Sequence, residues 1–165
     1  LQIKTLRGNV GTRLGKLDAG EYDAIILASA GLKRLGLAER IRHCLAPTLS
    51  LPAVGQGALG LECRADDQEL LELISPLQHE VTSICVRAER AFNAYLEGGC
   101  QVPIAGYATI TQNQLHIEGR VGSVDGKTLL KEQLSGALGE GERLGVVLAE
   151  KLLAQGAGEL LKALY

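Results

Sequence analysis

The sequence predicts part of an α/β domain followed by a small α+β domain. The first prediction depends on residues 24–28, an apolar run that follows a helical segment and has the length and β-branching of a fully buried strand. The second depends on residues 81–96, where apolar residues recur every three or four positions, and on the alternating segments after them. We therefore expect a parallel α/β fragment, and then an antiparallel sheet covered on one face by helices.

A glycine-punctuated turn at residues 6–11 leads from a weakly alternating, strand-like segment at residues 1–5 into a short helix that ends near Gly20. Such a turn directs backbone N–H groups and the positive end of the helix toward one place, which favours an anion. All charged residues before Asp18 are basic, namely Lys4, Arg7, Arg13 and Lys16. The pattern indicates either an anion site or a solvated basic turn.

Two nucleotide-binding motifs can be tested by their spacing. A P-loop needs Ser or Thr after its lysine, whereas Gly15-Lys16 is followed by Leu17. Residues 55–60 read Gly-x-Gly-x-x-Gly, but this motif has meaning only between a strand and a helix, and residues 61–64 read as a second short strand. We therefore expect neither a P-loop nucleotide nor NAD or FAD.

The other elements follow from the same periodicities. Residues 30–35 come directly after the buried strand, where open α/β sheets bind ligands, so Arg34 is a further candidate for an anion. Helices are expected at residues 37–45, 67–77 and 142–155, with a last turn or two from residue 159. The three strands of the antiparallel meander are expected at residues 104–110, 115–121 and 128–134.

The amino-acid composition excludes several classes of binding partner. The chain is 46% hydrophobic and 22% charged with a net charge of −2, and it has one Phe and no Trp, so neither nucleic acid nor an anionic membrane is expected. No apolar run approaches membrane-spanning length. The four cysteines lack the spacing of a metal site or a Cys-x-x-Cys motif, so we expect no metal, reduced thiols and a cytoplasmic location.

Cys100 follows the helix of residues 81–96 and is separated from it by Gly98 and Gly99. These glycines are expected to end the helix in the left-handed conformation, and Pro103 keeps the next residues out of a helix, so Cys100 lies on a short loop. A free cysteine is more often a small buried apolar residue than a reactive group. The negative helix end also disfavours a thiolate, so a reactive Cys100 would need arginines nearby.

The residues around Cys100 form a longer pattern. Glu89-Arg90, a helical spacer, Gly98-Gly99-Cys100 and then Val102-Pro103-Ile104 resemble the porphobilinogen deaminases, also called hydroxymethylbilane synthases. The resemblance implies that Cys100 holds a dipyrromethane cofactor through a thioether. It also implies that carboxylates of the cofactor and of the growing pyrrole chain are bound by Arg7, Arg13 and Arg34, and that Gln56 lies near the same cleft.

The implied reaction condenses four porphobilinogen molecules head to tail into hydroxymethylbilane, with release of ammonia and with linear pyrrole intermediates. The family's general acid is an aspartate beside a lysine, and none of the aspartates here matches that motif. We therefore expect no catalytic residue in this chain and no activity of the chain alone.

The resemblance also implies three parts: residues 1–54 as the C-terminal half of a second, α/β domain of periplasmic-binding-protein type, residues 55–77 as a strand and helix that return to a first domain, and residues 78–165 as the C-terminal domain. The chain contains no Met, and the family's N-terminal portion has no counterpart, so we expect a fragment. Residues 55–77 should then expose apolar surface and favour self-association.

Two alternatives remain open at this point. The chain could be a non-enzymatic small-anion binding domain of periplasmic-binding-protein type, which predicts no covalent adduct on Cys100. It could also be a structural interaction module, which requires an exposed apolar patch and no cleft.

Overall fold

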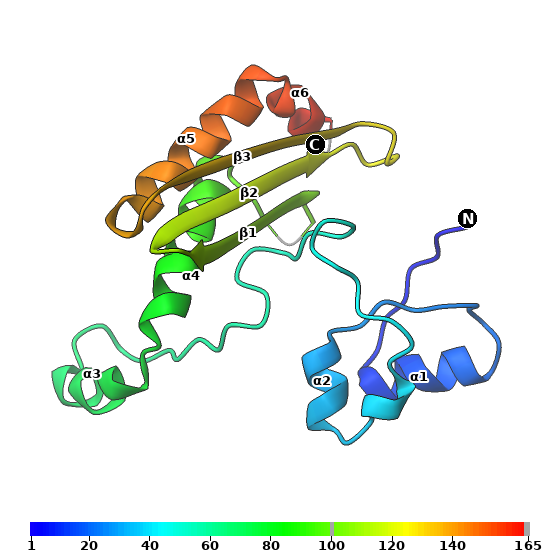
Figure 1. Ribbon diagram of the computed structural model, residues 1–165. Coiled ribbons are helices and arrows are strands. Elements are labelled where there is room, and N and C mark those ends of the chain that lie inside the picture. The colour runs from blue at the N-terminus through cyan, green and yellow to red at the C-terminus, as the bar shows by residue number, and fades with distance from the viewer. Residues whose placement is uncertain (100, 164–165) are drawn as a thin grey trace. The chain divides into compact units, whose positions relative to one another are not determined.

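A computed structural model describes residues 1–99 and 101–163. The chain forms two compact units, Leu1–Leu45 and Ala46–Tyr165, and each is described by itself below. Within the described residues no helix combines the length and the apolar character needed to cross a lipid bilayer. The larger unit contains the sheet and the main hydrophobic core (Figure 1).

The N-terminal unit contains α1 (Val10–Asp18), α2 (Ser29–Arg34) and a 3₁₀ turn, η1 (Ala38–Arg40). The side-chain oxygen of Asn9 caps α1 by accepting a hydrogen bond from the Thr12 N–H at 2.8 Å. Only two apolar side chains of this unit, Leu14 and Leu32, are buried. The unit also contains a 2.5 Å ion pair between Arg40 and Asp18, but this pair is solvent-exposed and adds little stability to so small a core.

The strands expected in the N-terminal unit are wrong for this structure, and its predicted parallel α/β, periplasmic-binding-protein-like architecture is not confirmed. Residues 1–5 and 24–28 have no strand structure, and Ile3 and Ile26 keep 94% and 79% of their surface exposed. A strand needs a neighbour to pair its N–H and C=O groups, and no other segment among residues 1–45 forms a ladder. The expected helix at residues 37–45 is reduced to η1, because so short a helix without packing does not propagate.

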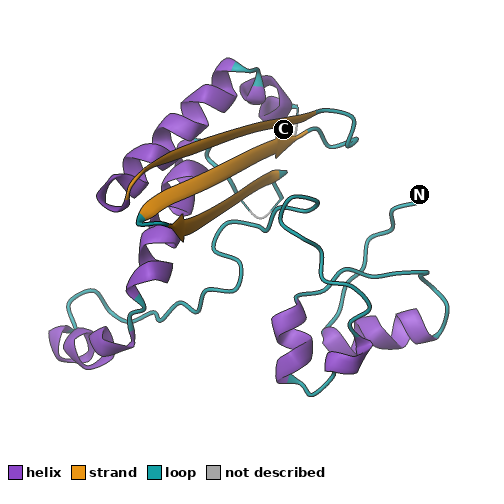
Figure 2. Cartoon of the chain, in the orientation of Figure 1, coloured by secondary structure: helices purple, strands orange, loops and turns teal. Residues whose placement is uncertain are grey.

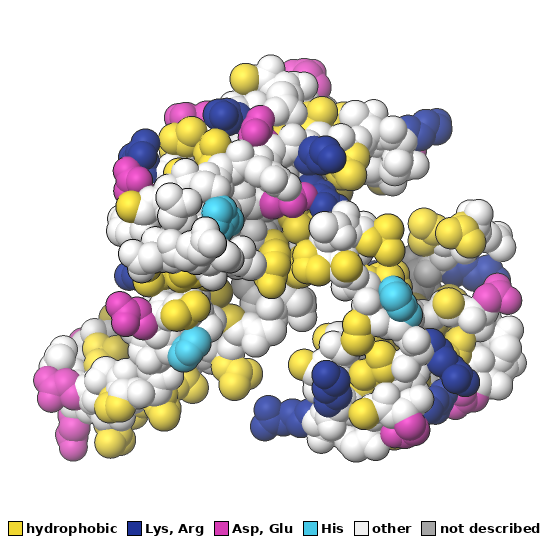
Figure 3. All heavy atoms as spheres, viewed as in Figure 1, with side chains coloured by type: hydrophobic (Ala, Val, Ile, Leu, Met, Phe, Trp, Pro, Cys, Tyr) yellow, Lys and Arg dark blue, Asp and Glu magenta, His cyan; other side chains and the backbone are white. Residues whose placement is uncertain are grey.

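Residues 46–79 are mostly irregular, and the expected strand at residues 61–64 is absent. The expected helix is present as α3 (Gln68–Ile74), continued by the 3₁₀ turn η2 (Ser75–Leu77). Asp67 caps α3 by accepting from the Leu70 N–H at 3.2 Å. No residue of α3 is buried, and hydrophobic side chains cover much of the visible surface of this segment, at the lower left of Figure 3.

The C-terminal domain confirms the predicted α+β arrangement. It contains α4 (Glu80–Tyr95), the antiparallel strands β1 (Ile104–Thr111), β2 (Gln114–Gly122) and β3 (Leu129–Ala137), η3 (Leu138–Glu140), α5 (Gly141–Ala154) and α6 (Ala157–Lys162). The sheet order is β1-β2-β3, and α4 and α5 cover one of its faces (Figures 1 and 2). Gln112 and Asn113 both have positive φ, as the tight turn between β1 and β2 requires.

Phe92 of α4 is the only phenylalanine of the chain, and it lies at the centre of this core. Its ring packs on Gly106 and Gly119, which face each other on β1 and β2. A Cβ at Gly119 would lie 2.6 Å from the ring, so the glycine pair leaves the space that the ring fills. The close crossing of α4 and α5 also depends on a glycine, since a Cβ at Gly145 would meet the backbone of Ala88 and Phe92.

The segment after the first unit is fastened to the C-terminal domain. Arg120 of β2 donates from Nη2 to the carbonyl oxygens of Pro47 and Thr48, both at 3.2 Å, and Glu118 holds the guanidinium in place. The division between the units therefore falls after Leu45, whereas boundaries were predicted at 54/55 and 77/78. Those boundaries concern packing against a first domain and stay a prediction.

Candidate functional site

The turn before α1 carries Arg7 and is braced by Arg13. Arg13 donates from Nε to the Gly8 carbonyl at 2.7 Å, while Arg7 is exposed. Gly8 has φ of 126°, and a Cβ there would lie 2.9 Å from the Thr12 side chain. The local sequence thus fixes the turn, and it leaves the terminal guanidinium nitrogens of Arg13 without a hydrogen bond in the described part of the chain.

Arg34 is the last residue of α2 and is exposed. Within residues 1–99 and 101–163, neither Arg34 nor Arg7 has an ion pair or a side-chain hydrogen bond, whereas Arg40 is held by Asp18. The N-terminus of α1 has fewer free N–H groups for an anion than the sequence suggested, because the Thr12 N–H already donates to the Asn9 side chain. The exposed arginine side chains are therefore the main candidate anion-binding groups of this unit.

Gln56 lies in a tight double turn in the second unit. Its N–H donates to the Ala53 carbonyl at 3.0 Å, and the Ala58 N–H donates to the Gly55 carbonyl at 3.1 Å. Gly55 and Gly57 both have positive φ, at 68° and 88°, which explains the glycines on either side of Gln56. The residues directly after the turn form neither a strand nor a helix. The strand on which the exclusion of a dinucleotide motif depended is therefore absent, and that exclusion stays a prediction.

Glu89 joins this turn to the helix that precedes the cysteine. Its carboxylate accepts hydrogen bonds from the Gly55 N–H at 2.7 Å and from the Ala108 N–H of β1 at 2.8 Å, and only 5% of the residue is exposed. Burial raises the pKa of Glu89, and the two N–H bonds oppose that shift. Burial and the Glu89 charge also raise the pKa of Cys85, so Cys85 acts as a small apolar core residue.

The loop that leads to Cys100 begins differently from the prediction. The helix ends in a Schellman motif, in which the Glu97 N–H donates to Ala94 O and the Gly98 N–H to Asn93 O, at 3.1 and 2.9 Å. The left-handed residue is Glu97, with φ of 53°, and neither glycine has positive φ. The expectation that Gly98 and Gly99 take this conformation is therefore wrong. Cys100 itself lies outside the described residues.

Gly98 is required for a different reason. The side-chain amide of Asn93 donates to the Gly98 carbonyl at 3.2 Å, and a Cβ on Gly98 would collide with that same amide. On the other side of Cys100, the Gly122 N–H donates to the Pro103 carbonyl at 2.9 Å. The loop is thus attached to α4 at one end and to the sheet at the other.

The sequence matches two family models. Residues 1–72 match porphobilinogen deaminase, dipyromethane cofactor binding domain, and residues 83–154 match porphobilinogen deaminase, C-terminal domain. The chain belongs to the porphobilinogen deaminase family. Porphobilinogen deaminases are transferases of porphyrin and haem biosynthesis, and the first matched domain is the one that binds dipyrromethane.

The candidate residues divide between the two porphobilinogen deaminase models. Arg7, Arg13, Arg34 and Gln56 lie within residues 1–72, and Cys100 lies within residues 83–154. The structure brings Arg13 to the turn of Arg7, and it joins the turn of Gln56 to α4 through Glu89. The charges suit dipyrromethane, because its acetate and propionate carboxylates need cations and Arg7 and Arg34 have no acidic partner in the described structure.

Glu89 and Asn93 hold loops of this porphobilinogen deaminase in place, but the sequence analysis gave neither residue a structural role. The role of Glu89 could have been predicted, because its carboxylate lies on the apolar face of α4 between Cys85 and Phe92, where a buried carboxylate must be hydrogen-bonded. The role of Asn93 could not have been predicted, since its contact with Gly98 depends on how the helix ends.

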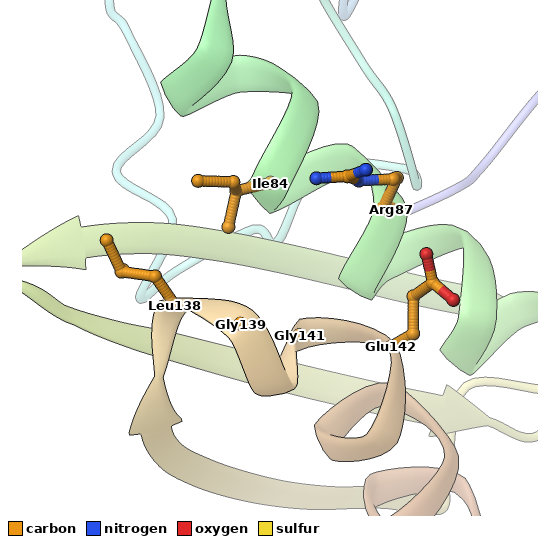
Figure 4. Close-up of a pocket in the computed structure, with 6 residues that line it drawn as sticks. All are labelled: Ile84, Arg87, Leu138, Gly139, Gly141 and Glu142. Atoms are coloured by element: carbon orange, nitrogen blue, oxygen red, sulfur yellow. The ribbon is translucent and has the colours of Figure 1, made fainter.

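A cavity of about 230 Å³ between α4 and the start of α5 is separate from these residues (Figure 4). Ile84 and Leu138 contribute apolar surface, and Arg87 and Glu142 contribute opposite charges. No residue predicted to bind the cofactor lines it. Its mixed, open lining gives no reason to assign it to the porphobilinogen deaminase reaction.

Proposed function

We propose that this chain is the cofactor-carrying part of a hydroxymethylbilane synthase, which condenses four porphobilinogen molecules head to tail into hydroxymethylbilane and releases ammonia. Its own task is to hold the pyrrole chain while it grows. The observation that carries this proposal is the set of arginines without acidic partners in a chain of the porphobilinogen deaminase family.

Arg7, Arg13 and Arg34 would bind the acetate and propionate groups of successive pyrrole rings. A guanidinium can hold a carboxylate by two parallel hydrogen bonds, which fixes the ring's orientation as well as its charge. The Arg13 bond to Gly8 leaves its two terminal nitrogens for this purpose. Gln56 would contribute neutral donors and acceptors from its exposed turn.

Cys100 would hold the dipyrromethane cofactor through a thioether. When bound, dipyrromethane supplies the two pyrrole rings to which substrate rings are added. The thiol must be reduced to form this bond, which fits the cytoplasmic location expected from the sequence. The tie between Asn93 and Gly98 would limit the motion of the cysteine loop relative to α4.

Loss of ammonia needs a general acid, and the aspartates of this chain are poor candidates for it. Asp18 is paired with Arg40, Asp67 caps α3, and Asp125 bonds Ser123 and Lys127. Asp23 and Asp66 are exposed and match no family motif. We therefore propose that the chain alone does not turn over porphobilinogen, and turnover by a pure sample would contradict this.

The covalent assignment is tested by mass. The chain is combined with the N-terminal portion of a porphobilinogen deaminase, which supplies the general acid, and with porphobilinogen. It is then denatured and weighed, and any adduct is located by peptide mapping. We expect added mass equal to two linked pyrrole units on the Cys100 peptide, lost in Cys100→Ser and kept in Cys63→Ser. An unmodified Cys100 together with reversible porphobilinogen binding would favour the small-anion binding domain instead.

The arginine assignment is tested by calorimetric titration with porphobilinogen. Arg7→Gln and Arg34→Gln should each weaken binding about tenfold, the usual effect of losing one charge-assisted hydrogen bond. Arg143→Gln, an exposed arginine of the C-terminal domain, is the matched control. Equal effects of all three changes would show that only net charge matters.

A further inference from the structure

We infer that Glu89 is a positioning residue, whose buried carboxylate fixes the Gln56 turn to the helix that leads to Cys100. This inference depends on the proposed function, because it assumes that Gln56 contacts the pyrrole ligand. Glu89 belongs to the sequence pattern by which the chain resembles its family, but that pattern gives it no contact with the 53–58 turn.

Glu89 is the only charged side chain that is buried among the described residues. It has no cationic partner there, and each oxygen accepts one backbone N–H, from Gly55 and from Ala108. Burying a carboxylate costs free energy unless its oxygens are satisfied, so a purely apolar residue would suit the core better. The carboxylate is therefore explained by what it holds, which is one loop and one strand.

The Gln56 turn has few other attachments. Val54 packs against Gly106 of β1, and Arg120 holds the chain earlier, at Pro47 and Thr48. After Gly55, no side-chain hydrogen bond holds residues 56–63 in the described structure. Glu89 is thus the last fixed point before Gln56, and its bond to Gly55 is adjacent to the residue it would orient.

The same carboxylate also reaches the sheet. Ala108 is next to the strand positions that pack on Phe92, and Phe92 follows Glu89 by one helical turn. The position of the Gln56 turn is thereby set relative to α4 and β1 together. A side chain with one acceptor in place of two would keep only one of these connections.

Glu89→Gln is the first test, because the amide replaces one acceptor by a donor that faces an N–H. We expect faster hydrogen exchange at Gly55 or Ala108, and porphobilinogen binding about tenfold weaker. Gln56→Ala should also weaken binding in the original chain but should add little in the Glu89→Gln background. Glu150→Gln, an exposed carboxylate on α5, is the control and should leave affinity unchanged.

A second variant guards against a folding defect. Gly57→Ala strains the turn at φ of 88° but meets no atom within 4 Å, so the core stays intact. Its loss of affinity should likewise disappear when Gln56 is Ala. Independent, additive losses from Glu89 or Gly57 and Gln56 would overturn the positioning role. A chain that does not bind porphobilinogen at all would overturn the proposed function and this inference with it, while the exchange data would still show the Gly55 tie.

Discussion

Glu89 shows how one side chain responds to opposing effects. Its burial favours the protonated carboxyl, while two N–H donors favour the carboxylate, and burial is the larger effect because its pKa is raised. A raised pKa means that the folded chain holds this proton more tightly than the unfolded chain does. The Glu89 contribution to stability is therefore complete below pH 4.5 and is lost as the pH rises through the folded pKa.

This predicts a pH-dependent difference between the original chain and Glu89→Gln. The stability of the original chain, relative to the variant, should fall as the pH rises from 4.5, because glutamine does not titrate in this range. Urea unfolding at a series of pH values measures the difference. A difference that grew with pH would mean that the two backbone bonds outweigh burial.

Glu97 carries backbone strain that glycine would relieve. Its φ of 53° costs a residue with a Cβ about 1 kcal/mol, since the left-handed region is crowded for such residues. Glu97→Gly should therefore raise the free energy of unfolding by about that amount. Glu97→Ala keeps the Cβ and serves as the control. Equal stability of the two variants in urea unfolding would show that the strain is absent.

At the scale of elements, the contact of α4 with the sheet depends on glycines, whose lack of a side chain leaves room for the Phe92 ring. Gly119→Ala would place a Cβ 2.6 Å from the Phe92 ring, and we expect a loss of about 2 kcal/mol from overpacking. Gly139→Ala, which meets no atom within 4 Å, should have little effect. In a Phe92→Leu background the Gly119→Ala cost should shrink, and an unchanged cost in thermal unfolding would show that the ring is not responsible.

At the scale of the whole molecule, the exposed apolar residues have no partner in the described structure. Leu73 and Leu77 keep 74% and 70% of their surface exposed, and Leu59 and Leu61 lie on the same 55–77 segment. Burying such side chains against a second copy is favourable, so we expect concentration-dependent self-association. Sedimentation velocity should show it, and Leu73→Lys with Leu77→Lys should reduce it.

Val124→Lys is the control for this prediction, because Val124 is as exposed but lies in the turn between β2 and β3. Association that Val124→Lys reduced equally would point to general hydrophobicity rather than to residues 55–77. A monomer at all concentrations, with α3 strongly protected from hydrogen exchange, would contradict the prediction.

The sequence by itself determined the C-terminal domain, α1 and α3. These elements carry their information locally: the apolar face of α4, the alternation of β2 and the caps at Asn9 and Asp67 are set by residues a few positions apart. It also determined the family, because the pattern around Cys100 combines helix, loop and sheet residues in one short stretch.

Only the tertiary structure decided the remainder. Residues 24–28 have the composition of a buried strand, but a strand forms only where another backbone completes its hydrogen bonds. The left-handed residue is Glu97 rather than a glycine because α4 ends one residue earlier than predicted, which puts Glu97 at the left-handed position of the Schellman motif. Glu89 could be recognised as a buried carboxylate, but its partners at Gly55 and Ala108 are 34 and 19 residues away. Contacts over such separations depend on how the chain packs, and local patterns do not contain that information.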